Sequence, residues 1–65
     1  MQIFVNGDRH DIESETLALA LDRLGYGGKK IATAVNGHFV AAAARPGVKL
    51  ADGDKVEVVA PMQGG

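Results

Sequence analysis

The sequence predicts an α+β domain in which a single mixed β-sheet packs on one main α-helix. Two observations carry this prediction. Short runs with alternating apolar residues lie near both ends of the chain and in its middle, and the stretch 17–24 has the spacing of an amphipathic helix. Because one helix cannot cover both faces of a sheet, we expect all the strands to share one sheet, with the helix on its concave side.

The first predicted strand covers residues 1–5, where every second residue from Met1 is apolar and shares one face. Asn6-Gly7 follows directly. This dipeptide is the strongest short hairpin signal, because both central residues of the turn need a positive φ. A second strand, about Arg9 to Glu13, then returns alongside the first, with Ile12 as its inward apolar residue.

The predicted helix follows a capping residue, Ser14 or Thr16, whose side-chain oxygen can accept a hydrogen bond from the first turn. Gly25 ends the helix, because glycine readily adopts the left-handed conformation found just after many helices. Between these residues an apolar face follows the helical period. Its members are Leu17, Ala20, Leu21 and Leu24.

A second pair of short strands is predicted in the middle of the chain. Residues 31–35 alternate between alanines and larger residues, and Asn36-Gly37 repeats the hairpin signal before a strand over 38–41. Residues 42–49 are expected to be irregular, because Pro46-Gly47 interrupts them.

A final strand is predicted over 55–60, after a turn at Asp52-Gly53-Asp54. Val56 and Val58 share one face of this strand, and Pro61 ends its pairing because proline has no N–H to donate. The long chain between the first and last strands permits a crossover. We therefore expect these two apolar strands to be parallel neighbours.

The composition excludes several classes of protein. A chain of 65 residues predicts one domain, residues 1–65, and an apolar fraction of 46% is ordinary for a globular protein. The absence of cysteine excludes disulfides and thiolate metal sites, and it favours a cytoplasmic location. The opening residues 1–5 are too short and uncharged for a signal peptide, so we expect none, and the sequence contains no apolar run of membrane-spanning length. With a net charge of −1, we expect neither a nucleic-acid partner nor a membrane partner.

The chain ends in Gly64-Gly65, shortly after the last predicted strand. We expect residues 61–65 to form a flexible tail. Two glycines remove every side chain from the last two positions, so such an end can enter a narrow channel in a partner and bend within it. The alternative is an ordinary mobile end, but the predicted order of elements together with the nearby closing strand favours a functional terminus.

A combination of motifs spread over the whole chain resembles one family. These motifs are Asn6-Gly7, the Thr16-Leu17 helix start with Leu21 and Leu24, Val35-Asn36-Gly37, residues 50–56 and Gly64-Gly65. Together they resemble the ThiS sulfur carriers of thiamine biosynthesis, which have the ubiquitin-like β-grasp fold. The chain departs from the usual family pattern at residues 41–47 and 61–63.

The resemblance implies that the protein is a sulfur carrier and not an enzyme. An E1-like adenylating enzyme of the ThiF type, using ATP and Mg²⁺, would activate the carboxylate of Gly65. A cysteine desulfurase would supply the sulfur, and the resulting thiocarboxylate would serve a thiazole synthase of the ThiG type. Gly64, Gln63 and Met62 would be recognised as the tail, and the carrier itself would bind no metal or cofactor.

Three other functions stay open at this point. The small subunit of molybdopterin synthase shares the fold and the diglycine end, although such chains are usually longer. A ubiquitin-like modifier would instead form an isopeptide bond with a lysine. A plain interaction module would make no use of its terminus.

Phe4 and Val59 form a possible partner surface. If their strand neighbours face the helix, both side chains face outward, on one exposed sheet face with Met62 near its end. An exposed apolar patch often marks a protein-binding surface, although single exposed apolar residues are common. Phe39 is not assigned to a face, because the length of the loop at Asn36-Gly37 decides it.

The remaining polar motifs are expected to be structural. Residues 25–29 contain three glycines followed by Lys29, but they follow a helix and lack the spacing of a phosphate loop. His10 and His38 have no companion ligand motif. Two acidic pairs fit turn chemistry better than acid–base catalysis. These pairs are Asp8 with Asp11 and Asp52 with Asp54.

Overall fold

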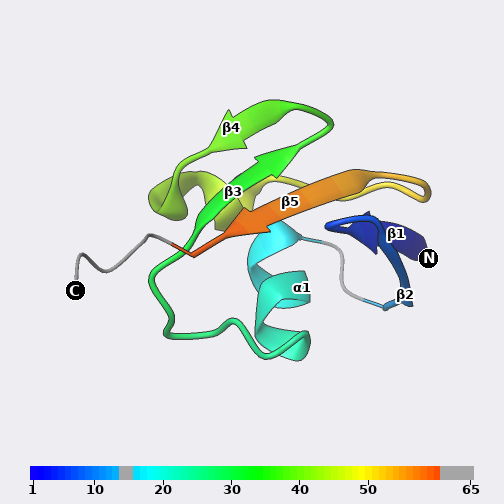
Figure 1. The fold of residues 1–65 in the computed structure, drawn as a ribbon, viewed down its shortest axis with the longest axis horizontal. Helices are drawn as coiled ribbons and strands as arrows, with labels where there is room; N and C mark the ends of the chain where they lie inside the picture. Colours follow the sequence, from blue (N-terminus) through cyan, green and yellow to red (C-terminus); the bar gives the residue numbers. More distant parts are fainter. Residues whose placement is uncertain (14–15, 61–65) are drawn as a thin grey trace.

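The computed structural model describes residues 1–13 and 16–60, and within them it has the predicted α+β architecture (Figure 1). In this part of the chain five strands form one sheet, and the α-helix lies against one face of it. The expected tail at 61–65 and the candidate cap Ser14 lie outside the described residues. In chain order the elements are β1 (Gln2–Val5), β2 (Asp8–Asp11), α1 (Leu17–Arg23), β3 (Ala32–Val35), β4 (His38–Val40), the 3₁₀-helix η1 (Ala42–Gly47) and β5 (Lys55–Val59).

The sheet is mixed, with the strand order β2-β1-β5-β3-β4. The first and last strands are parallel neighbours, as predicted, with Phe4 opposite Lys55 and Val5 opposite Val56. The two hairpins are antiparallel, and β5 also runs antiparallel to β3. The last strand in the sequence is therefore the middle strand of the sheet.

Both Asn-Gly dipeptides form the predicted tight turns. The φ angles are 51° and 86° at Asn6 and Gly7, and 50° and 83° at Asn36 and Gly37. Two successive positive φ angles characterise the type I′ turn, whose twist matches that of a hairpin. The strands around these turns begin and end within two residues of their predicted limits.

The helix has the predicted signals at both ends. The hydroxyl of Thr16 accepts a hydrogen bond from the N–H of Leu19 at 3.2 Å. At the other end Gly25 has a φ of 94°. The N–H groups of Gly25 and Tyr26 then donate to carbonyls of the last turn, the Schellman arrangement that satisfies the end of a helix.

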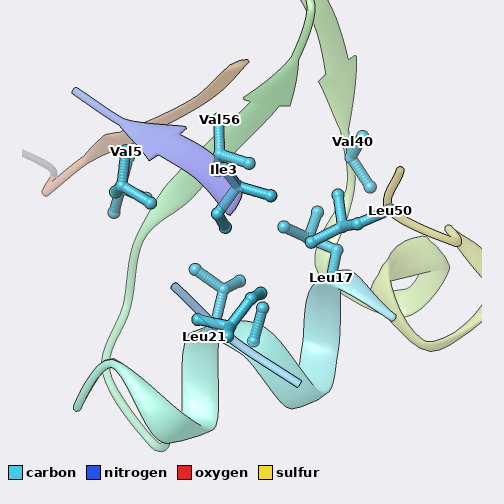
Figure 2. Close-up of a cluster of buried hydrophobic side chains, with 10 residues drawn as sticks. Ile3, Val5, Leu17, Leu21, Val40, Leu50 and Val56 are labelled. Atoms are coloured by element: carbon cyan, nitrogen blue, oxygen red, sulfur yellow. The ribbon is translucent and has the colours of Figure 1, made fainter. Parts of the chain in front are cut away.

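The core lies between α1 and the sheet. Figure 2 shows Ile3, Val5 and Val56 on the sheet side, facing Leu17 and Leu21 on the helix. All of the apolar positions that were predicted to face inward from the first and last strands are buried, except Met1. The buried apolar residues are Ile3, Val5, Ile12, Leu17, Ala20, Leu21, Val40, Leu50, Val56 and Val58.

The expectation of irregular structure over 42–49 is wrong for residues 42–47, which form η1. The side chain of Arg45 holds this element against β3. Its Nε donates to Oγ1 of Thr33 at 3.0 Å, and its Nη2 donates to the carbonyl oxygen of Ile31 at 2.7 Å. Because these contacts join residues 12 and 14 positions apart, the local pattern around Pro46-Gly47 does not reveal them.

The turn before β5 is pinned to β1. The N–H of Gly53 donates to the carbonyl of Gln2 at 2.7 Å, and the N–H of Gln2 donates to the Asp52 carboxylate at 2.6 Å. The N–H of Phe4 then donates to the carbonyl of Asp54 at 2.9 Å, which starts the parallel ladder. The carboxylate of Asp54 accepts the N–H of Ala51 at 2.8 Å, so both acidic residues have the turn role that the sequence predicts.

Candidate functional site

The candidate site is the C-terminal end of the chain, where the tail residues lie outside the described part. These residues are Met62, Gln63, Gly64 and Gly65. The structure describes the sheet that carries them: β5 reaches Val59, and the exposed Ala60 is the last described residue. In Figure 1 the β5 arrow ends on the left, whereas the N-terminus lies on the right.

Alternate residues of β5 direct their backbone groups to opposite neighbours. The carbonyl of Val56 accepts the N–H of Asn6 on the β1 side, at 2.9 Å. The carbonyl of Lys55 accepts the N–H of Asn36 on the β3 side, at 2.7 Å. By this alternation the backbone of Val58 faces the β1 side. However, β1 ends before this level, because the chain turns into β2 at Asn6.

The side chain of Asn6 takes the place of the missing strand. Its Nδ2 donates to the carbonyl of Val58 at 2.9 Å, and its Oδ1 accepts the N–H of Val58 at 2.8 Å. A primary amide carries the same donor and acceptor as a peptide group. The Asn6 amide therefore continues the β1–β5 ladder by one further step toward the tail.

Asn36 makes an analogous contact at the other end of β5. Its Oδ1 accepts the N–H of Lys55 at 3.0 Å, and its Nδ2 donates to the carboxylate of Asp54 at 3.0 Å. Each hairpin turn thus contributes an asparagine that bonds to β5. The sequence indicates only the turn role of these asparagines, because the strand that they reach is distant along the chain.

An exposed apolar surface lies on the sheet face away from α1, beside the end of β5. Phe39 pairs with Ala34, and Val59 pairs with Ala32, so these four residues share one face. We call them the tail-side patch. Phe39 is 75% exposed and Val59 is 61% exposed. Val59 directly precedes Ala60, so this patch reaches the last described residue of the chain.

Phe4 shares that face but lies at the other end of β5. It is half-buried and stands opposite Lys55, four residues before Val59. With five neighbouring residues Phe4 lines a shallow hollow of about 530 Å³. These neighbours are Asn6, Gly7, Lys55, Val56 and Glu57. Among the described residues, Phe39 is therefore the aromatic side chain nearest in register to Val59, and the sequence had left its face unassigned.

The other polar motifs lie apart from the end of β5 or hold turns. His10 on β2 and His38 on β4 occupy opposite edges of the sheet. Residues 25–29 continue the end of α1, and the loop begins with the left-handed Gly25. Within residues 1–13 and 16–60, no three His, Cys, Asp or Glu side chains group together as metal ligands would.

None of the helices in the described part of the chain has the length and apolar character needed to cross a membrane.

Comparison with known proteins shows similarity along the whole chain. The model of the ThiS family matches residues 3–65. The chain is 38% identical over 63 residues to the sulfur carrier protein ThiS of Thermus thermophilus, covering 97% of this chain and 98% of the relative. Both matches span most of the sequence and not only its short motifs.

Solved structures show the same relationship. A crystal structure of the thiamine biosynthesis protein ThiS from Geobacter metallireducens matches with a TM-score of 0.81 and 26% identity, over 100% of both chains. A solution structure of a thiamine biosynthesis protein from the same organism has a TM-score of 0.76 and 25% identity, over 100% of this chain and 88% of the other. The predicted β-grasp fold is therefore confirmed.

Proposed function

The chain belongs to the ThiS family, and from this premise we propose that it is a sulfur carrier of thiamine biosynthesis, modified at the carboxylate of Gly65. The observation that carries the proposal is the family match over residues 3–65, which includes the diglycine end. In this role the protein is a carrier whose chemistry is performed by partner enzymes.

The proposed chemistry begins with activation of the terminal carboxylate. A carboxylate is a poor electrophile, because its charge is delocalised and oxide would have to leave. An adenylating enzyme of the ThiF type solves this problem with ATP and Mg²⁺. An oxygen of Gly65 attacks the α-phosphorus, pyrophosphate leaves, and an acyl adenylate forms.

Sulfur transfer then replaces the adenylate. A persulfide from a cysteine desulfurase attacks the acyl carbon of Gly65, forms a C–S bond and expels AMP. A thiol next attacks the inner sulfur of the resulting acyl disulfide, the Sγ of the donor cysteine, so that the S–S bond breaks, the thiocarboxylate leaves and a disulfide remains on the partner. The product is a thiocarboxylate at Gly65, which donates its sulfur to a thiazole synthase of the ThiG type.

The residues before Gly65 suit passage through an enclosed active site. Gly64 has no Cβ to collide with groups that surround the acyl carbon, and it reaches backbone conformations that other residues avoid. We propose that Met62, Gln63 and Gly64 contact the channel that the tail enters. Ordering this segment on binding costs conformational entropy and so lowers the net affinity. Contacts between the partner and the folded body of the domain offset this loss.

We propose that the adenylating enzyme binds the tail-side patch, together with Phe4. Two observations support this occupant. The patch is apolar and includes a largely exposed aromatic residue, the type that is enriched in the centres of interfaces. It also includes Val59, which directly precedes Ala60 and the tail, so one enzyme can hold the patch and receive Gly65.

Intact-mass measurement after reconstitution tests the proposed function. The protein is incubated with ATP, Mg²⁺, a ThiF-type adenylating enzyme, a cysteine desulfurase and cysteine. We expect a mass increase that corresponds to one sulfur replacing one oxygen, mapped by fragmentation to Gly65. Deletion of Gly65 is the control and should abolish the change.

Two results would contradict the proposal. One is an unchanged mass in the full reaction, with a known ThiS carrier modified in parallel. The other is full activity in thiazole formation after Gly65 is deleted. Sulfur transfer to molybdopterin synthase but not to thiazole synthase would favour the molybdopterin alternative, and an isopeptide bond to a lysine would indicate a protein modifier.

A further inference from the structure

We propose that Asn6 is a positioning residue for the terminus. Its side-chain amide holds the end of β5 on the β1 side, one residue before the last residue that pairs with β3. It thereby limits how many residues a partner must order to reach Gly65. The contact between Asn6 and Val58 lies within the described residues. Its effect on the modification of Gly65 rests on the proposed function.

The need for Asn6 arises from a mismatch between two neighbouring strands. β1 turns away at Asn6, where φ is 51°, while β5 continues to Val59. Val58 directs its N–H and carbonyl toward the β1 side, where no further backbone follows. The two hydrogen bonds to the Asn6 amide, at 2.8 and 2.9 Å, fill this gap. Since Val58 is buried, its backbone groups gain from a fixed partner.

Loss of the Asn6 amide shortens the part of β5 that is hydrogen-bonded on both the β1 side and the β3 side. Without it the last bond from β1 to β5 is the one between the N–H of Asn6 and the carbonyl of Val56. Residues 57–59 are then held only through β3, and their fluctuations increase. Each residue that has to be ordered again on binding lowers the affinity about fivefold to thirtyfold.

Asn36 provides a matched control within the same chain. Asn6 and Asn36 have nearly equal φ angles of 51° and 50°, each precedes a glycine, and each amide makes two hydrogen bonds with the β5 region. They differ in position, because Asn36 bonds to Asp54 and Lys55 at the start of the strand. Asn6→Gly and Asn36→Gly both remove the amide and keep a residue that accepts a positive φ.

The first measurement is made on the free protein and does not depend on its function. Amide hydrogen exchange is followed residue by residue in the wild type, Asn6→Gly and Asn36→Gly. We expect faster exchange at Val58 in Asn6→Gly, with little change there in Asn36→Gly. Unchanged protection of Val58 in Asn6→Gly would overturn the structural part of the inference.

The second measurement is ATP–pyrophosphate exchange catalysed by the ThiF-type adenylating enzyme, with each carrier as substrate. We expect kcat/KM to fall about tenfold for Asn6→Gly and to change less than about twofold for Asn36→Gly, because small displacements of a reacting end strongly reduce productive encounters. Thermal unfolding of both variants shows whether their stabilities are matched. A general loss of stability would lower kcat/KM for both variants, whereas loss of a positioning role would lower it only for Asn6→Gly.

The outcomes separate this inference from the proposed function. If the wild type supports no exchange, the proposed function fails, while hydrogen exchange still tests the Asn6 contact. If the wild type is active and the two glycine variants have equal kcat/KM, the positioning role is wrong. Should Asn6→Gly not fold, Asn6→Asp replaces it. Asp keeps the acceptor for the Val58 N–H but lacks the donor, so its kcat/KM should lie below that of the wild type, and an unchanged value would overturn the inference.

Discussion

The guanidinium of Arg45 donates a hydrogen bond from Nε to Oγ1 of Thr33 at 3.0 Å. The same hydroxyl donates to the carbonyl of Val40 at 2.8 Å, and Thr33 is only 2% exposed. This short chain of hydrogen bonds joins η1, β3 and β4 at a buried position. These hydrogen bonds hold η1 against β3 and β4 at this edge of the sheet, in addition to apolar contacts.

Replacing Thr33 with valine should therefore destabilise the protein. Valine has nearly the same shape but leaves the carbonyl of Val40 and the Nε of Arg45 without this partner. We expect a loss of about 1–3 kcal/mol in the free energy of unfolding, measured by urea denaturation. A double-mutant cycle with Arg45→Ala checks the cause, because the two effects should be less than additive. Full additivity would show that the contact contributes nothing.

The end of α1 should depend on the backbone freedom of Gly25. Its φ of 94° is unfavourable for a residue with a side chain, so Gly25→Ala should lower the free energy of unfolding by about 1–2 kcal/mol. Gly47→Ala is the control, because no positive φ occurs there and no atom lies within 4 Å of an added Cβ. We expect that change to be neutral or slightly stabilising in the same denaturation experiment. Equal effects of the two substitutions would refute the role of Gly25.

Two leucines of α1 should respond differently to truncation. Leu17 is fully buried, whereas Leu19 is 52% exposed. Leu17→Ala should cost about 2–5 kcal/mol, because it leaves a cavity between the helix and the sheet. Leu19→Ala should change the stability by less than about 0.5 kcal/mol. Thermal unfolding followed by circular dichroism measures both, and a similar effect of the two would contradict the described packing.

The tail-side patch should matter for binding more than for stability. Phe39→Ala removes a largely exposed aromatic ring, so we expect about tenfold weaker binding to the adenylating enzyme with nearly unchanged unfolding. Val59→Ser tests a second position of the patch and Phe4→Ala tests the residue at the other end of β5; Phe4→Ala should also lower the stability because that ring is half-buried. Leu19→Ala is the control for loss of apolar surface elsewhere. Calorimetric affinities that equal the wild-type value for all three would exclude this surface.

Local signals in the sequence were sufficient for most elements of the fold. The positive-φ turns at Asn6-Gly7 and Asn36-Gly37, the cap at Thr16 and the stop at Gly25 all lie where predicted, because each depends on residues only a few positions apart. The prediction failed at residues 42–47, where the contact between Arg45 and Thr33 accompanies a 3₁₀-helix. The modification of Gly65 stays a prediction, because the end of the chain lies outside the described residues.

By itself, the sequence determined the fold class, most of the inward-facing apolar positions and the parallel pairing of the first and last strands. Only the tertiary structure decided which side chains meet across the sheet. Asn6 bonds to Val58, 52 residues away, and Phe39 joins Val59 on the outer face through the register of β3. The physical reason is that a shift of one residue between strands reverses the face of every side chain, and this register emerges only when all strands pair.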